Sequence, residues 1–227
     1  MGKRGQKPKG KVKIKWSPNF AYAIGLLVTD GCLSKDGRHI DFTSADKEQI
    51  KNFLKALNIK VKIGKKHNSQ KDIAFRAQFS DIPFYKFLQS IGLTQRKSLT
   101  IEKVDIPSDL FFDFLRGCLD GDGCSYSYWD PRWRSSFMFY ISFASSSVKF
   151  IKWLQKEVHK RLKIKSHVGV SKGKVNPSYQ LRYSKYAAIE LVKKMYYNRH
   201  VIYLLRKYSK IQKALKIEKK QQKRYRR

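Results

Sequence analysis

The feature of this sequence that most constrains its fold is an internal duplication. The segment AIGLLVTDGCLS, residues 23–34, aligns with LRGCLDGDGCSY, residues 115–126, at an offset of 92 residues. The identical pairs are Gly25 with Gly117, Asp30 with Asp122, Gly31 with Gly123, and Cys32 with Cys124. Self-similarity of this kind indicates a repeated structural unit, so we expect the chain to fold as two related halves.

The match continues downstream in the same order. Residues 42–57 align with residues 143–158 at an offset of 101, so the second copy holds nine extra residues, which SYWDPRWRSS at 127–136 can supply. Two shorter matches follow, of residues 80–93 with 184–197 and of QRKS at 95–98 with LRKY at 205–208. Chance explains one such match easily but explains four in order poorly.

Each copy predicts the same order of elements, αββαββα, which is an α+β fold with antiparallel sheets. An apolar helix ends at Asp-Gly, where glycine can adopt the left-handed capping conformation. Alternating residues around Asp36-Gly37 predict a hairpin. The amphipathic helices are predicted at 46–57 and 147–161, and the second strand pairs at 60–65 with 72–80 and at 164–171 with 177–184. The predicted domains are a basic arm at 1–16, repeats at 17–105 and 106–215, and a basic tail at 216–227.

The charge of the chain predicts a polyanionic partner. Lys and Arg total 50 against 17 Asp and Glu, which gives a net charge of +33. Such a field attracts nucleic acid first and a membrane surface second, while a ribosomal or solubilising role is the plainer alternative. We expect the arm to be partly disordered and the tail to clamp a nucleic-acid backbone or to lack fixed structure.

Other classes of protein are disfavoured. No apolar run approaches the roughly 20 residues of a membrane span, and the N-terminal segment lacks the apolar core of a secretory signal. The three cysteines are odd in number and form no CxxC pair, and the five histidines have no metal-ligand spacing. We therefore expect an intracellular protein with reduced thiols.

Small residues at four-residue spacing occur in both apolar helices, as Gly25 with Thr29 and as Gly117 with Gly121. Such faces let two helix backbones approach closely, so the two helices are expected to pack in parallel about a pseudo-twofold axis. Asp30 and Asp122 would then meet at two negative helix ends, which is unfavourable unless a cation lies there. A hard divalent cation, Mg²⁺ by default, or nearby lysines could supply that charge.

These two segments resemble the name-giving motif of the LAGLIDADG homing endonucleases, in the single-chain form with two motifs. The resemblance covers the chain from about Phe20 to Lys213, with Val28 where the family often has an acid. It implies a saddle of two sheets in the DNA major groove, and hydrolysis of one phosphodiester on each strand of a long, asymmetric site, leaving short 3′ overhangs.

The resemblance also implies roles for individual residues. Asp30 and Asp122 would hold the metal ions, with the backbone carbonyls of Thr29 and Gly121 as further ligands. An outer shell around the attacking water would include Asp46 and Ser147, and Lys97 and Lys207 would lie near the scissile phosphates. Asp120 has Val28 as its counterpart, so we expect it to cap a helix or form local hydrogen bonds rather than to act in both halves.

The alternating strands present one face to the helices and another to base edges, where Arg and Gln suit bidentate contacts and Lys suits phosphates. The candidate DNA contacts are Lys35, Arg38, His39, Asp41, Thr43, Lys62, Lys65, Arg76 and Gln78 in the first copy, and Tyr126, Tyr128, Arg132, Arg134, Tyr140, Ser142, Lys165, His167, Lys172, Gln180 and Arg182 in the second.

The resemblance favours a monomeric, Mg²⁺-dependent DNA endonuclease encoded by a mobile intron or an intein-like element. Such a protein would be located wherever the DNA of its host gene resides. One alternative keeps the fold without cleavage, as a maturase that binds intron RNA or as a DNA-binding regulator. A second alternative is a basic RNA-binding or ribosome-associated protein, which does not predict paired small-residue helices ending in Asp. Retention of Asp30 and Asp122 favours catalysis, because a protein that only binds has no need of converging carboxylates.

Overall fold

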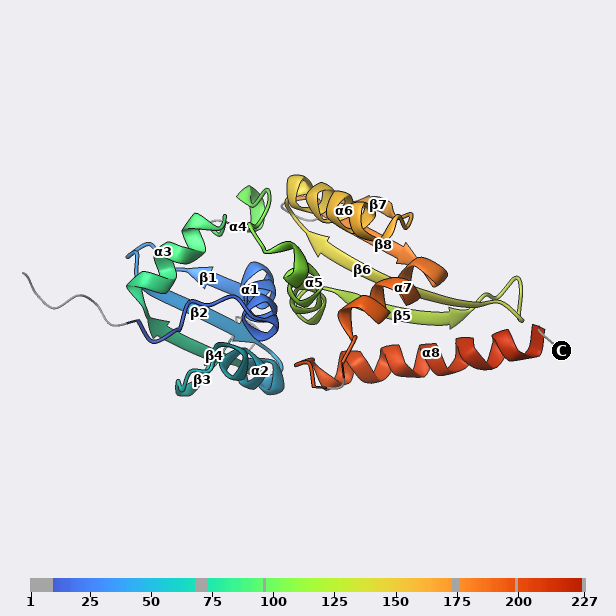
Figure 1. Cartoon of the computed structure of the whole chain (residues 1–227), viewed down its shortest axis with the longest axis horizontal. Coiled ribbons are helices and arrows are strands. Elements are labelled where there is room, and N and C mark those ends of the chain that lie inside the picture. Colours follow the sequence, from blue (N-terminus) through green and yellow to red (C-terminus); the bar gives the residue numbers. More distant parts are fainter. Residues whose placement is uncertain (1–9, 68–72, 96, 173–175, 199, 226–227) are drawn as a thin grey trace, which may run out of the picture.

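The computed structural model describes residues 10–67, 73–95, 97–172, 176–198 and 200–225, and its two halves have the same order of elements (Figure 1). The first half contains α1 (Pro18–Asp30), β1 (Gly31–Leu33), β2 (His39–Ser44), α2 (Lys47–Leu57), β3 (Ile63–His67), β4 (Ile73–Ser80) and α3 (Ile82–Ser90). The second contains α5 (Phe111–Asp120), β5 (Cys124–Trp129), β6 (Phe137–Ser145), α6 (Val148–Leu162), β7 (His167–Ser171), β8 (Ser178–Ser184) and α7 (Lys185–Met195). The predicted α+β class and the twofold αββαββα order are confirmed.

Three further elements lie outside the duplicated order. A short helix, α4 (Lys97–Thr100), and a 3₁₀ turn, η1 (Ser108–Leu110), connect the halves. The last helix, α8 (Leu205–Tyr225), follows the second half and runs beside it in Figure 1. No helix in the described part of the chain is both long and apolar enough to cross a membrane.

Each half has one four-stranded antiparallel sheet, in the order β1-β2-β4-β3 or β5-β6-β8-β7. Side chains alternate along the central strands: Ile40 and Phe42 of β2 are buried, whereas the residues between them are more accessible. The same alternation buries Phe139 and Ile141 of β6. Because successive side chains point to opposite faces, each sheet has a core face under its helices and a second, open face.

Helices α1 and α5 form the main contact between the halves, and Figure 1 shows them between the two sheets. A Cβ atom on Gly25 would lie 2.2 Å from the carbonyl oxygen of Phe114, and one on Gly121 would lie 1.9 Å from Oγ1 of Thr29. Gly25 also faces Gly117, so successive contacts run in the same direction along both helices. The predicted parallel packing of small-residue faces is confirmed.

The predicted left-handed glycine caps are wrong. Gly31 has a φ of −81° and extended backbone, and among the described residues only Gly37 and Gly92 are glycines with positive φ. A Cβ on Gly31 would lie 2.5 Å from the carbonyl oxygen of Leu27, and one on Gly123 would lie 2.5 Å from the Cα of Leu119. Glycine is therefore required after each aspartate because the chain folds tightly back on its own helix, rather than because φ is positive.

The described parts of both terminal segments contact distant parts of the chain. Residues 1–9 of the predicted arm lie outside the described residues, but the amides of Lys11 and Val12 donate to Oδ2 of Asp81 at 2.6 and 2.8 Å. The predicted tail is part of α8 as far as Tyr225. Both segments are fixed by contacts with distant parts of the chain, which local composition does not reveal.

Candidate catalytic and nucleic-acid-binding site

The carboxylates of Asp30 and Asp122 share one electrostatic site at the ends of the paired helices. Asp30 is the last residue of α1, and Asp122 follows the end of α5 by two residues. Partial burial raises the pKa of Asp30 to about 6; the charge of Asp122 adds to the rise, and Lys207 and Lys97 oppose it. Although the Asp122 side chain reaches solvent, surrounding protein atoms also raise its pKa. At Asp30, burial and the repulsion from Asp122 therefore outweigh the attraction of the two lysines, so ionising both carboxylates is unfavourable.

Two buried lysines hold the carbonyl groups beside these aspartates. Nζ of Lys97 donates to the carbonyl oxygen of Thr29 at 3.0 Å. Nζ of Lys207 donates to the carbonyl oxygens of Leu119, Gly121 and Gly123 at 2.8, 2.6 and 2.7 Å. Burial lowers the pKa of both lysines, and the aspartate charges oppose that change.

The lysines do not neutralise the aspartates by direct contact. Among the described residues, no ion pair within 4.0 Å joins either lysine to Asp30 or Asp122. The carbonyls of Thr29 and Gly121, expected as metal ligands, are here acceptors for lysine. Each carbonyl oxygen keeps a second lone pair, so these hydrogen bonds still leave an acceptor position.

Gln49 is a functional candidate that the sequence analysis missed. Its Nε2 donates at 3.1 Å both to Oδ2 of Asp30 and to the carbonyl oxygen of Asp120, and its Oε1 accepts from Ser44 at 2.9 Å. The side chain is 2% exposed and bridges the two motif helices. Its counterpart in the second copy, at the offset of 101, is Phe150. A polar amide where the other copy has an apolar ring is the sequence feature that could have identified Gln49 as a site residue.

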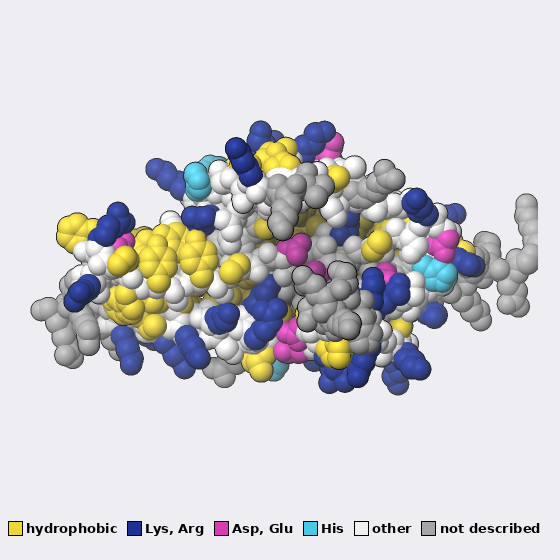
Figure 2. Space-filling model, turned by 180° about the vertical axis from the view of Figure 1, so that it is seen from behind, with side chains coloured by type: hydrophobic (Ala, Val, Ile, Leu, Met, Phe, Trp, Pro, Cys, Tyr) yellow, Lys and Arg dark blue, Asp and Glu magenta, His cyan; other side chains and the backbone are white. Residues whose placement is uncertain are grey.

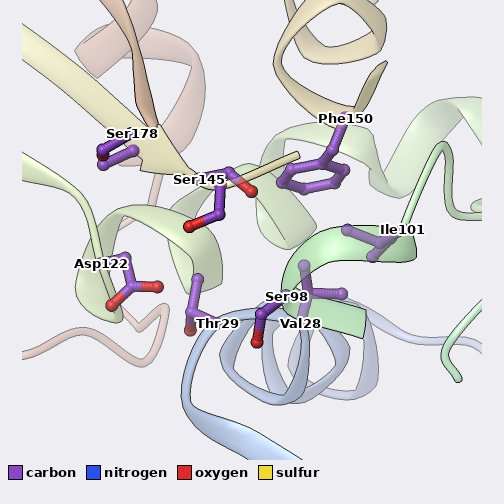
Figure 3. Close-up of a pocket in the computed structure, with 10 residues that line it drawn as sticks. Val28, Thr29, Ser98, Ile101, Asp122, Ser145, Phe150 and Ser178 are labelled. Atoms are coloured by element: carbon purple, nitrogen blue, oxygen red, sulfur yellow. The ribbon is translucent and has the colours of Figure 1, made fainter. Parts of the chain in front are cut away.

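The surroundings of Asp122 differ from those of Asp30. No hydrogen bond from another described residue reaches its carboxylate, which borders a cavity of about 370 Å³. Figure 3 shows Asp122, Thr29, Ser145 and Ser178 around this space, with Phe150 on another side of it. The two halves of the centre are therefore chemically unequal, with one aspartate restrained by an amide and the other beside an open, hydroxyl-lined space.

Asp46 and Ser147, expected around the attacking water, are engaged elsewhere. Asp46 caps α2, accepting from the amide of Glu48 at 3.0 Å and from Nε of Arg206 at 2.9 Å. Ser147 caps α6, and its Oγ donates to the carbonyl oxygen of Ile101. Gln49, rather than Asp46, contacts Asp30 in this structure.

Asp120 has the structural role expected of it, but its hydrogen bonds reach distant residues instead of local ones. Its Oδ2 accepts from the hydroxyl of Tyr22 and from the amide of Leu204, both at 2.8 Å. The side chain is fully buried, which raises its pKa to about 6 although these hydrogen bonds and Lys207 oppose the rise. Asp120 thus fixes the start of α8 and, three residues into it, the position of Lys207.

The oxygen donors at the centre fit a hard divalent cation better than a soft one. Carboxylates and carbonyls converge at the helix ends, and no cluster of three or more His, Cys, Asp or Glu residues suited to a metal is present in the described residues. Two carboxylates provide only part of a coordination shell. A cation here would take further ligands from water or from a bound phosphate.

The open face of the first sheet carries charged and polar side chains. Asp41 pairs with Gln78 and Thr43 with Arg76 across β2 and β4, and Arg76 forms an ion pair with Asp41. His39 lies on the same face and contacts Asp36 in the hairpin turn. Lys65 pairs with Phe75, which packs against the core, so Lys66 rather than Lys65 shares the face of Arg76.

The open face of the second sheet is aromatic at one end and polar at the other. The Tyr140 ring stacks on Tyr126 at 4.9 Å and on Tyr128 at 6.1 Å between ring centroids. Arg182 lies opposite Ser142 and His167, and it donates to Gln180 at 2.8 Å. Figure 2, seen from behind Figure 1, shows acidic side chains near the middle and a large hydrophobic-class patch over the C-terminal half.

The remaining candidate contacts lie in turns, connections and sheet ends. Arg132 pairs with Asp130 in the long loop between β5 and β6. The others are exposed or partly exposed there: Lys35, Arg38, Lys62, Arg134, Lys165 and Lys172. The structure thus brings most predicted contacts to the two open faces and their margins.

Residues 17–92 match the family described as LAGLIDADG-like domain. The I-LtrWI LAGLIDADG homing endonuclease, solved bound to target DNA, has a TM-score of 0.57 at 14% identity, covering 89% of this chain and 91% of that one. A structure of the homing endonuclease I-DmoI has a TM-score of 0.53 at 15% identity, covering 80% and 97%. No curated protein sequence matches the chain.

The chain also resembles full-length DUF199/WhiA from Thermatoga maritima, with a TM-score of 0.54 at 15% identity. The similarity covers 92% of this chain but only 64% of the WhiA chain, so the chain spans less than two thirds of that protein. At these identities the likeness is one of fold. Because one fold can host different activities, the activity of this chain depends on the residues of its site.

Proposed function

We propose that this chain, a member of the LAGLIDADG family by its domain match and its fold, is a site-specific DNA endonuclease. It binds a long, asymmetric duplex across its two open sheet faces and hydrolyses one phosphodiester in each strand with divalent metal ions. The observation that carries this proposal is the convergence of Asp30 and Asp122 at one electrostatic site, where burial and then the charge of Asp122 raise the pKa of Asp30 to about 6.

Different residues of the chain would bind the metal ions, orient a ligand and stabilise the developing charge. Asp30 and Asp122 would hold Mg²⁺, and a bound divalent ion supplies activation of water and neutralisation of developing phosphate charge. Gln49 orients Asp30 through its amide. Lys97 and Lys207 fix the carbonyls at the helix ends and add positive charge near the scissile phosphates, which favours the transition state.

The neighbours support a DNA partner and a divalent cation. I-LtrWI was solved bound to target DNA, and I-DmoI was solved in complex with DNA and Ca or Mn. The open faces of this chain carry Arg, Gln and Lys residues of the kind that read base edges and phosphates. We infer that the protein acts as a monomer, since it contains both halves of the pseudosymmetric centre.

A second candidate function is binding without cleavage, as a DNA-binding protein or as a maturase that binds intron RNA. The observation in its favour is that Lys97 and Lys207 already occupy acceptor positions on the carbonyls of Thr29 and Gly121. In this alternative the two lysines, rather than metal ions, would balance the charge of the aspartates.

A library of plasmids containing the uninterrupted host sequence or randomised inserts separates these functions. Incubation with Mg²⁺ should linearise a defined subset of plasmids, whereas Ca²⁺ or EDTA should support binding at most. Sequencing of the ends gives the site and the overhang. Binding without any Mg²⁺-dependent strand break, together with improved splicing of an intron RNA, would favour the maturase.

The rate of cleavage is expected to fall as the pH drops below about 6. Asp30 has a pKa of about 6, and its protonated carboxyl cannot hold a cation well. Since a metal ion competes with the proton, higher Mg²⁺ should move the midpoint to lower pH. Single-turnover rates at pH 5–8 and two Mg²⁺ concentrations test this, with DNA binding in Ca²⁺ as control. A midpoint that ignores Mg²⁺ would contradict this assignment.

A further inference from the structure

We propose that the groove between the edge strand β5 and helix α8 binds the sugar-phosphate backbone of the same DNA duplex, outside the two sheet faces. The inference rests on the proposed function in one respect, namely that duplex DNA lies on the open faces. It adds a phosphate-binding element that the first half cannot match, because its equivalent helix α4 has four residues against the 21 of α8.

The groove lies where the second sheet ends. β5 is the outermost strand of that sheet, and α8 runs alongside it in Figure 1. A cavity of about 310 Å³ lies between them, lined by Ser125, Tyr126, Ser127, Phe139, Lys210 and Lys213. Ammonium and hydroxyl groups are the usual partners of backbone phosphates. Neither Lys210 nor Lys213 forms an ion pair with another described residue.

Helix α8 is fixed along its length, so its outer lysines are held in place. Lys207 is tied to three carbonyls near the start, and Ile211 and Ala214 are buried in the middle. Further on, Glu218 is buried and pairs with Lys185 at 3.3 Å, while Gln221 donates to the carbonyl oxygen of Ser135 at 2.7 Å. A phosphate site on this helix would therefore need little ordering on binding.

The same contacts turn the only acid of α8 inward and leave a basic outer face. Beyond the first turn and as far as Lys220, the exposed residues of α8 are all lysines: Lys210, Lys213, Lys216, Lys219 and Lys220. Glu218 is the one acidic residue among the helix's described positions, and it is 4% exposed. In Figure 2 Lys and Arg side chains also border the lower edge of the molecule, beneath the hydrophobic-class patch of the C-terminal half.

The position of Tyr126 connects this basic face with the proposed DNA-binding surface. Tyr126 lines the groove and also stacks on Tyr140 on the open face of the second sheet. Ser125, Ser127 and Phe139 lie on the core side of the sheet, so the groove follows the outer edge of β5 and reaches the open face at Tyr126. A duplex whose major groove receives the sheet has a sugar-phosphate strand at this margin, where two uncompensated lysines lie. Charge complementarity thus favours the backbone of duplex DNA as the occupant.

The test compares two double variants with the same change of charge. Lys210→Gln with Lys213→Gln removes the groove lysines, and Lys152→Gln with Lys156→Gln removes two exposed lysines from α6, on the helix-covered side of the same sheet. Binding of a duplex containing the cleavage site, or of mixed-sequence duplex DNA, is measured in Ca²⁺ from 50 to 300 mM salt. A thermal melt checks that both variants fold as the parent does.

The groove variant is expected to bind the duplex roughly tenfold more weakly. In a plot of the logarithm of the binding constant against the logarithm of the salt concentration, its slope should be smaller in magnitude by about 1 to 2, since each lost phosphate contact contributes about 0.9. The α6 variant should change much less. Equal effects of the two variants, or an unchanged slope in the groove variant, would overturn the inference while leaving the endonuclease proposal intact. An effect confined to single-stranded RNA would also overturn it. Absence of any duplex binding by the parent protein would overturn both.

Discussion

Replacement of Asp122 by Asn should lower single-turnover DNA cleavage by about a thousandfold or more while leaving binding in Ca²⁺ within a few fold. The carboxylate reaches solvent and borders the hydroxyl-lined cavity, so it is free to hold a cation over a bound phosphate. Metal-ion stabilisation of a phosphoryl transition state is worth several kcal/mol, and each 1.36 kcal/mol is about a tenfold change in rate. Asp30→Asn should have an effect of similar size, because each strand needs charge from the shared centre.

The same change at Asp30 should stabilise the metal-free protein. The folded-state pKa of about 6 is raised above the ordinary value of 3.8, so the folded state binds more protons than the unfolded state between these values. Stability is therefore lost as the pH rises through that window, by on the order of 3 kcal/mol. Asp30→Asn removes this loss, so its melting temperature in EDTA should exceed that of the parent at pH 7.5 but not at pH 4.

Cleavage and melting together make this prediction specific. A purely structural role for Asp30 would lower the melting temperature and the activity together. A catalytic role predicts lower activity with equal or higher stability, a trade-off expected where like charges are held close for function. Asp109→Asn is a suitable control because this acid lies in the connecting turn η1, away from the motif ends. A variant at Asp30 or Asp122 that still cuts at the parent rate would end the endonuclease proposal.

The parts of the fold that could be predicted are those that depend on the local spacing of apolar and small residues and on the duplication of these patterns. Apolar spacing gave the amphipathic helices within a residue or two, and small residues at four-residue spacing predicted the contact of α1 with α5. Repetition added what one copy could not, since it identified Asp30 and Asp122 as equivalent. Their meeting at one site follows from the parallel contact of two helices that end in the same way.

The parts that could not be predicted depend on contacts between residues far apart in the chain. Asp120 reaches Tyr22 and Leu204, which are 98 and 84 residues away. Gln49 bridges to the carbonyl of Asp120, 71 residues away, and α8 is held as a helix by partners along the second half. The glycine after each aspartate was expected for its φ and is instead required by close packing. The glycine after each aspartate correctly indicated a position that excludes other side chains, but it did not reveal whether φ or close packing excludes them.

The inequality of the two half-sites has the same origin. The duplicated halves keep the aspartates but differ around them. Gln49 of the first copy corresponds to Phe150 of the second, and Val28 corresponds to Asp120. Each exchange changes what surrounds one carboxylate: Asp30 gains an amide donor, and the second motif gains a buried acid that anchors α8. A single chain can diverge in this way because its halves need not be identical, which suits recognition of an asymmetric DNA site.

Replacement of Gly117 by Ala should destabilise the protein by at least about 3 kcal/mol, at or above the upper end of the usual cost of overpacking. The new Cβ would lie 2.1 Å from the carbonyl oxygen of Tyr22 and 3.0 Å from the Cα of Gly25. Both neighbours are backbone atoms of a buried helix, so no flexible side chain can move aside. Urea unfolding followed by circular dichroism measures the loss.

Gly64→Ala is the matched control, since its Cβ would meet only the carbonyl oxygen of Arg76, at 3.8 Å. It should change stability by less than about 0.5 kcal/mol, as is usual away from special sites. Because the α1–α5 contact also sets the separation of Asp30 and Asp122, Gly117→Ala should slow cleavage even at low temperature, where circular dichroism reports a folded protein. A folded Gly117→Ala protein that cuts at the parent rate would show that the centre tolerates displacement of the helices, and the close backbone contact would then serve stability alone.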